Sequence, residues 1–69
     1  MSRRFQFVSG NSSKFWEIDK HQNQVTVRFG RIGTDGQIQT KTLGDAAAAA
    51  KHAEKQISAK LQKGYVEVA

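Results

Sequence analysis

The residues best suited to bind a ligand stand in one short run of this chain, where two arginines flank an aromatic residue and a glycine. The run is Arg28-Phe29-Gly30-Arg31, at the end of an apolar segment that alternates like a strand. Guanidinium groups form planar, charge-assisted hydrogen bonds to phosphate oxygens, and an aromatic ring offers a flat face to a sugar or a base. This pattern predicts a contact surface for phosphates and nucleotides.

Each residue of the run also has a structural interpretation. Phe29 alternates with the valines of its segment, so its ring can equally belong to a core. Arg28 can rest on Phe15 or pair with Glu17, as a solvated charge at a strand end. Gly30 and the two glycines after it favour turns and bulges over a phosphate loop, because the run leads into a strand and offers no helix N-terminus.

Groups suited to catalysis or metal binding are few. The chain has no cysteine and two histidines, His21 in a predicted turn and His52 on the flank of a predicted helix. Its acids are not clustered at ligand spacing, and no serine stands plausibly with both a base and an orienting acid. We therefore expect no enzyme activity, no metal, no cofactor and no small-molecule substrate.

Length and charge favour a small binding module. A chain of 69 residues forms one domain, residues 1–69, with a modest core. Eleven Lys and Arg against six Asp and Glu give a net charge of +5 and a pI near 10.0, which attracts polyanions or serves solubility alone. No apolar run reaches the roughly 18 residues of a membrane span, and no secretory signal is evident, so we expect a cytoplasmic protein without membrane contact.

One helix is predicted from about Ala46 to Gln62, because Asp45 is a good N-cap and Gly64 a natural stop. Its apolar stripe is expected to pack on a sheet, with Ile57 and Leu61 filling the far end. The stripe comprises Ala46, Ala50, Ala53, Ile57 and Leu61. Its lysines either follow a nucleic-acid backbone or form a solvated face; they are Lys51, Lys55, Lys60 and Lys63.

Four alternating segments predict a twisted antiparallel sheet of about four strands, covered on one face by the C-terminal helix in an α+β fold. They are about Arg3 to Val8, Lys14 to Lys20, Asn23 to Gly30 and Gln37 to Leu43, with Tyr65 to Val68 as a possible edge strand.

A tight hairpin at His21-Gln22 would pair Ile18 with Val25, Trp16 with Val27 and Lys14 with Phe29 on the face under the helix.

The other face would stay partly open, with Lys41 near Phe15 and Arg28. Simple register in the first hairpin would add Phe5 and Phe7 to this open face. A bulge or a different pairing would instead place them beside Trp16 in the core, which we favour because an exposed phenylalanine stripe promotes aggregation.

These features resemble the WGR domain family, named for a Trp-Gly-Arg signature, in which Phe29 would stand at the tryptophan position. Matching strings lie along nearly the whole chain: Lys14-Phe15-Trp16-Glu17-Ile18, Gly36-Gln37 and Lys63-Gly64-Tyr65. Within the family, the chain resembles bacterial stand-alone WGR domain proteins, which are related to the WGR domain of poly(ADP-ribose) polymerases.

In those polymerases the signature tryptophan packs on the sugar of a terminal nucleotide, and the arginine contacts DNA or neighbouring domains. The resemblance implies these roles for Phe29 and Arg31, although phenylalanine lacks the indole N–H. The resemblance also implies that the polymerase activity associated with the family resides in a separate catalytic domain.

The expected function is therefore nucleic-acid binding, first of all to DNA, through backbone phosphates and sugars with little sequence specificity. The site residues are Phe29, Gly30, Arg31, Arg28 and Lys41. The alternative is a protein-protein interaction module. Since Met1 opens the domain and the chain ends just after it, such a partner is expected to act in trans.

Overall fold

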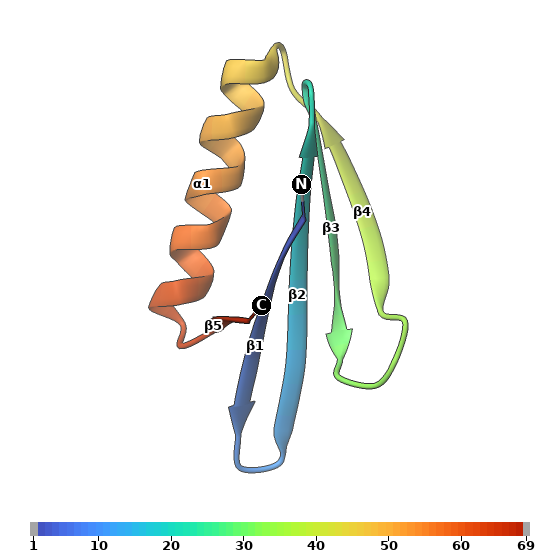
Figure 1. The fold of residues 1–69 in the computed structure, drawn as a ribbon, viewed down its shortest axis with the longest axis vertical. Helices are drawn as coiled ribbons and strands as arrows, with labels where there is room; N and C mark the ends of the chain where they lie inside the picture. The colour runs from blue at the N-terminus through green and yellow to red at the C-terminus, as the bar shows by residue number, and fades with distance from the viewer. Residues whose placement is uncertain (1, 69) are drawn as a thin grey trace.

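The protein, described here by a computed structural model over residues 2–68, has the α+β architecture predicted from the sequence. One antiparallel sheet of five strands packs against a single helix (Figure 1). The elements in chain order are β1 (Ser2–Ser9), β2 (Ser12–His21), β3 (Gln24–Arg31), β4 (Gln37–Thr42), α1 (Ala46–Gln62) and β5 (Val66–Val68). The spatial order is β4-β3-β2-β1-β5, so the possible C-terminal edge strand is confirmed and lies beside β1.

The register between β2 and β3 differs from the predicted one by two residues. Ile18 pairs with Val27 and Trp16 with Phe29, because His21 pairs with Gln24 and the turn therefore lies one residue further along the chain than expected. Gln22 adopts a φ of 55° in this turn. The turn is also tied to the segment after β4, since the Leu43 N–H donates to the Asn23 carbonyl over 2.8 Å. A slip of two residues keeps every side chain on its predicted face.

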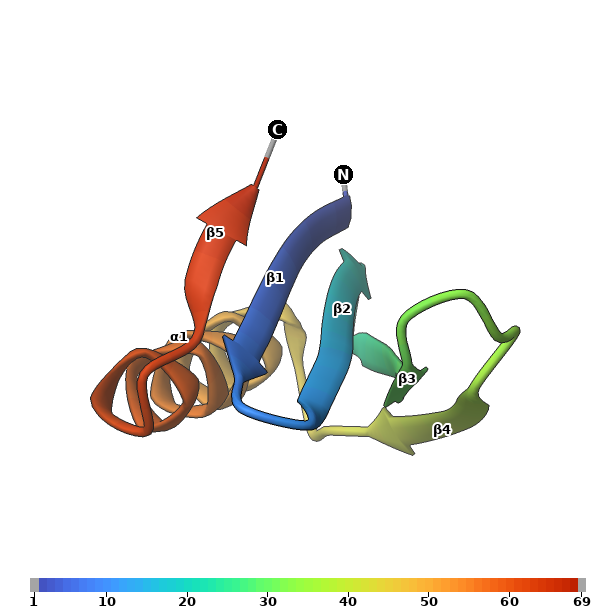
Figure 2. The ribbon, with the colours of Figure 1, turned by 90° about the horizontal axis from the view of Figure 1, so that it is seen from below.

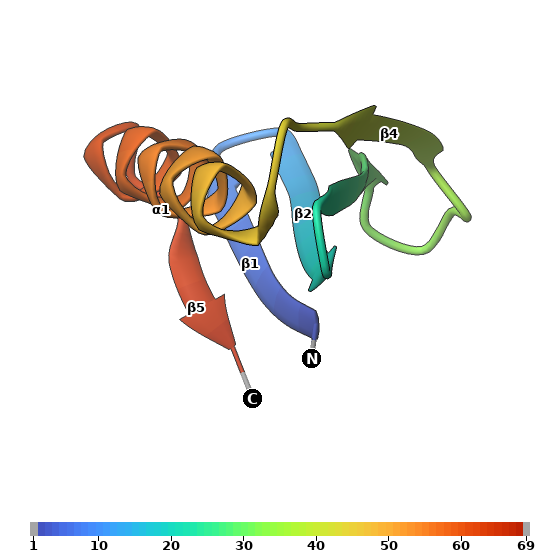
Figure 3. The same cartoon turned by 90° about the horizontal axis from the view of Figure 1, so that it is seen from above.

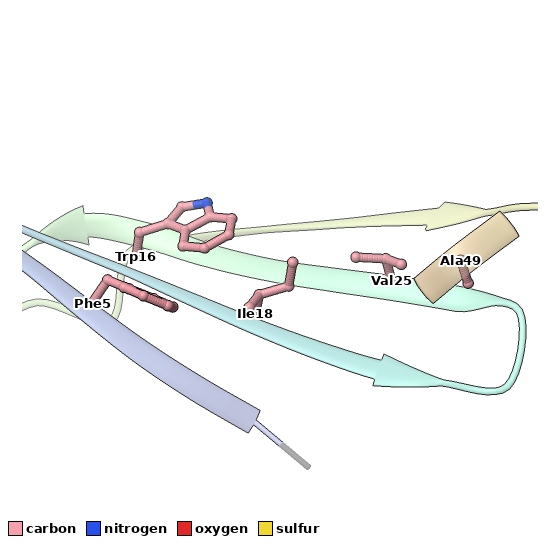
Figure 4. Packing of buried hydrophobic residues seen from close by; sticks show 5 residues of the cluster. All are labelled: Phe5, Trp16, Ile18, Val25 and Ala49. Carbon is pink, nitrogen blue, oxygen red and sulfur yellow. The ribbon is translucent and has the colours of Figure 1, made fainter. Parts of the chain in front are cut away.

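The core lies between α1 and the strands that face it. Its buried members come from three strands and the helix, and they are Phe5, Trp16, Ile18, Val25 and Ala49 (Figure 4). Phe5 pairs with Trp16 across the first hairpin, and their ring centroids are 5.5 Å apart. Phe7 lies on the same face, half-buried, with its ring 5.5 Å from Tyr65. The expectation that both phenylalanines belong to the core side is confirmed.

The helix begins and ends where the sequence predicted, but its buried stripe differs. The Asp45 carboxylate accepts a hydrogen bond from the Ala48 N–H at 2.7 Å, as an N-cap should. Ala49 is fully buried, whereas the predicted Leu61 is 50% exposed. The place expected for Leu61 is taken by Lys60, whose ammonium lies over the Trp16 ring. The prediction that Leu61 fills the far end of the core was therefore wrong.

The face of the sheet away from the helix is also partly covered. Phe15 on that face is 2% exposed, and the guanidinium carbons of Arg4 and Arg28 lie 4.6 and 5.5 Å from its ring centroid. The loop between β3 and β4 approaches the same ring. A Cβ on Gly36 would be 2.8 Å from the Phe15 Cζ, and one on Gly30 would be 2.9 Å from the Gly36 Cα.

This close approach gives Gly30 and Gly36 a structural reason to lack side chains. Gly36 also has a φ of 73°, which favours glycine.

The sheet is strongly curved. Viewed along its length from either end, α1 and β4 lie on one side of the central strands, whereas the two chain termini point to the other (Figures 2 and 3). With this curvature, Lys41 of β4 and residues of α1 line the same hollow.

Candidate nucleic-acid interface

Two neighbouring cross-strand pairs place aromatic and basic groups together at the end of β3. Trp16 pairs with Phe29, and one step outward Lys14 pairs with Arg31. All four residues lie on the helix side, because residues two apart in a strand share a face. Phe29 is half-buried and packs against the core, while Arg31 and Lys14 are exposed. Phe29 therefore packs on the core and remains partly accessible at the same time.

The C-terminal end of the helix adds a third cation to this group. The Lys60 Nζ lies 5.6 Å from the Trp16 ring centroid and 5.2 Å from that of Tyr65. Burial lowers the pKa of Lys60 below its ordinary value, and the nearby charges of Lys63 and Lys14 lower it further. A bound anion would relieve this repulsion, so the environment of Lys60 is one that an anion would stabilise.

These groups line one open cavity of about 410 Å³. Its walls are Asn11, Ser12, Ser13, Lys14, Phe15, Phe29, Gly30, Arg31, Lys60 and Tyr65. The polar groups are three cations and three small side chains that can donate hydrogen bonds, and the aromatic rings on this face are those of Phe29 and Tyr65, since the buried Phe15 ring lies on the opposite face. Such a lining fits a phosphate together with a sugar or a flat base.

The sequence-predicted residues do not all meet at this cavity. Phe29, Gly30 and Arg31 line it, whereas Arg28 lies on the opposite face and Lys41 lines a separate hollow. Lys41 pairs with Val25 and so points to the helix side. The expectation that Lys41 lies near Phe15 on the open face was wrong, because the pairing of β4 with β3 sets its face.

Arg28 is engaged in an ion-pair network. Its Nε and a terminal nitrogen donate to the two Glu17 oxygens at 3.1 Å each, and Arg4 donates to the same carboxylate. These hydrogen bonds, first that of Arg28 and then that of Arg4, lower the pKa of Glu17 against the opposing effect of burial. The structural interpretation of Arg28, resting on Phe15 and pairing with Glu17, describes its observed contacts.

Sequence reasoning missed Lys14 as a site residue and treated Lys60 and Tyr65 only as parts of larger patterns. Had the hairpin turn been placed one residue further along the chain, Lys14 would have been paired with Arg31 and recognised as a site residue. The place of Lys60 beside Tyr65 depends on the hydrogen bond from the Tyr65 N–H to the Lys60 carbonyl, 3.1 Å long, which folds the chain back after the helix.

Neither a metal site nor a membrane-spanning helix is found in the described part of the chain. Within residues 2–68, no group of three or more His, Cys, Asp or Glu side chains could hold a metal ion. Over the same residues, no helix is long and apolar enough to cross a bilayer.

The fold and this cavity together define a class of small α+β modules in which one helix and a curved antiparallel sheet present a basic, aromatic-lined hollow. The chain belongs to the WGR domain family, whose model matches residues 1–69. The family suggested by the short motifs is thereby confirmed.

Relatives from two bacteria share this domain. Protein YehF of Escherichia coli is 43% identical over 67 residues, which are 97% of this chain and 24% of YehF. YfeS of the same organism is 39% identical over 67 residues, 97% of this chain and 28% of YfeS. A crystal structure of a Bacteroides fragilis protein superposes with a TM-score of 0.98 at 46% identity, covering 100% of this chain and 20% of that one. The chain thus spans about a quarter or less of each relative.

Proposed function

We propose that this WGR domain binds nucleic acid, first of all DNA, through backbone phosphates and sugars at the end of β3. The observation that carries the proposal is the cavity in which one aromatic edge, that of Phe29, lies among the cations Lys14, Arg31 and Lys60. No carboxylate of residues 2–68 forms an ion pair with these three cations. They are therefore available to phosphate oxygens.

Each residue has a role that follows from its position. Phe29 offers a partly exposed ring edge to a sugar, and Arg31 a planar pair of donors to a phosphate. Gly30 has no side chain to offer, and it allows the close approach of Gly36. Arg28 holds the opposite face, so its contribution to binding is expected to be indirect.

Little sequence specificity is expected. The helix would need to present side chains to base edges in a groove, yet the cations of the cavity belong to a strand end and to the last turn of the helix. Phosphate contacts position a nucleic acid without reading its sequence.

A salt series with a DNA duplex tests the proposal. If the domain covers about three to five phosphates, log K should fall against log salt with a slope of about −3 to −4.5. Parallel measurements with a nicked duplex, a single strand and an RNA show which nucleic-acid structure the domain binds most tightly. Absence of binding at about 50 mM salt and high micromolar protein would contradict the proposal, since phosphate contacts are strongest at low salt.

A second candidate function is a protein-interaction module. It is favoured by the lengths of the relatives, because a domain that spans 20 to 28% of a longer protein has neighbouring segments to contact. Exposed apolar side chains on strands and strand ends, Val8, Ile38 and Val66, offer such contacts.

A further inference from the structure

The cavity at the end of β3 is one part of a longer trough. A second hollow of about 430 Å³ shares Lys60 with it and lies between the helix and β4. A third of about 200 Å³ shares Lys41, His52 and Gln56 with the second. The three hollows therefore follow one another from the Phe29 end along the space between α1 and β4, the two elements that lie on one side of the central strands in Figures 2 and 3.

The lining of this trough has a single sign of charge. Six of the eleven Lys and Arg residues line it, namely Lys14, Arg31, Lys41, Lys55, Lys60 and Lys63. None of the six acidic residues lines any of the three hollows. By contrast, Glu17 and Asp19 line the hollow on the opposite face of the sheet, and Glu54 lines the one on the other flank of the helix.

Walls of low dielectric concentrate the field of these lysines within the trough. From Lys63 back to His52 the helix rises about 1.5 Å per residue, roughly 16 Å in all. A wall of this length spans a few consecutive phosphates of a single strand. The second and third hollows have no Phe, Trp or Tyr in their lining, and their one ring is the small imidazole of His52, so they suit a phosphodiester backbone better than a row of stacked bases.

We propose that the trough between α1 and β4 binds the backbone of a nucleic-acid single strand that continues from the Phe29 cavity, with its bases turned outward. This inference rests on the proposed function and extends the binding surface from the cavity at the end of β3 to a track along the trough. A rigid duplex presents phosphates on a convex surface and reaches mainly the rim of such a trough, whereas a flexible strand bends into it. Lys41 and Lys55, on opposite walls, define the track beyond the shared Lys60.

The test compares a short and a long probe, fluorescein-labelled oligo-dT of about three and about ten nucleotides, by anisotropy at about 50 mM salt. The double variant Lys41→Gln/Lys55→Gln should weaken binding of the long probe by about 5- to 20-fold and of the short probe by less than about 2-fold. The slope of log K against log salt for the long probe should become less negative by about 1.4, which is the contribution of two phosphate contacts on a single strand.

A matched control removes the same charge elsewhere. Lys20 lines the hollow on the other flank of the helix, and Lys51 lines none of the three hollows of the trough. Lys20→Gln/Lys51→Gln should change binding of either probe by less than about 2-fold, because the track is intact. An equal loss in both double variants would overturn the track and leave only a general charge effect. All four lysines are at least partly exposed, and thermal melts verify folding.

The failure of the track differs from the failure of the proposed function. If wild-type protein binds both probes equally and Arg31→Ala weakens that binding, the cavity at the end of β3 is the binding site and the track is wrong. If wild-type protein binds neither probe nor duplex, both proposals are wrong. A ten-residue polyglutamate peptide that binds more tightly than the long probe, and is lost in the Lys41→Gln/Lys55→Gln variant, would assign the trough to an acidic protein segment instead.

Discussion

The two faces of the sheet use the same residue types in different ways. On the face away from the helix, Arg4 and Arg28 lie over the Phe15 ring and share the carboxylate of Glu17. On the helix side, Arg31 and Lys14 lie beside Phe29 without a carboxylate partner among residues 2–68. Both faces combine an aromatic ring with cations, but only one face neutralises them.

The difference separates structural charges from charges available to a ligand. A carboxylate between two arginines satisfies their donors and reduces their attraction for anions. On the helix side, packing holds three cations together, and burial and neighbouring charges lower the pKa of Lys60. An anion that binds there stabilises these cations. Sequence proximity conceals this division, since Arg28 and Arg31 are three residues apart but project from opposite faces.

The largest expected effect tests whether the Phe15 face is structural. Phe15 is 2% exposed, so Phe15→Ala should lower the free energy of unfolding by about 3 to 5 kcal/mol, enough to unfold much of so small a domain. Thermal or urea melts measure this. Ile38 on the same face is 67% exposed, and Ile38→Ala should change stability by less than about 0.5 kcal/mol. Equal melts for Phe15→Ala and wild type would contradict a structural face.

A smaller effect is expected at the centre of the charge network. Glu17→Gln leaves Arg4 and Arg28 without their shared carboxylate and should cost about 1 to 2 kcal/mol of stability, since the side chain is only 24% exposed. Because folding lowers the pKa of Glu17, its contribution is complete above the ordinary carboxyl pKa and is lost as pH falls through the lowered value.

Urea melts from about pH 6 to about pH 2 check the sign of this effect. The stability difference between wild type and Glu17→Gln should shrink as pH falls. Asp45→Asn is a control that removes a different carboxylate while keeping an N-cap side chain. A difference that stays constant over the whole range would show that the carboxylate charge is unimportant here.

Much of the fold was predictable from local patterns. Asp45 and Gly64 fixed the ends of the helix, and alternation assigned Trp16, Phe29 and Phe15 to their correct faces. Exact partners were not predictable, because the turn after β2 contains no glycine and its position depends on Gln22 adopting a φ of 55°. A two-residue error in register changed the partners of Trp16 without changing its face.

The candidate site was less predictable than the fold. Its strand-end residues Phe29 and Arg31 were evident as a motif, but Lys60 and Tyr65 meet because the helix packs Lys60 over Trp16 and the chain then turns at Gly64, with a φ of 100°. Lys41 was assigned to the wrong face, because its face follows from a pairing between β3 and β4 that crosses a five-residue loop. Such long-range contacts leave no local signature.

The smallest effect on stability, and the sharpest test of the comparison, is expected at Arg31. Arg31→Ala should leave the melting temperature nearly unchanged, because its side chain is exposed and its contacts within residues 2–68 come from the backbone: it pairs with Lys14, and its carbonyl accepts from the Thr34 hydroxyl at 2.7 Å and the Thr34 N–H at 3.1 Å. Binding of DNA should weaken by about 1 to 3 kcal/mol, the scale of a charged hydrogen bond, and Arg31→Lys should restore part of it.

Arg28→Ala is the matched variant and should do the opposite. It should lower the melting temperature through the loss of its bonds to Glu17 and leave DNA affinity close to wild type. Thermal melts and a DNA titration on both variants decide the matter: if the two arginines lose stability and affinity in equal proportion, the two faces do not divide structure from binding.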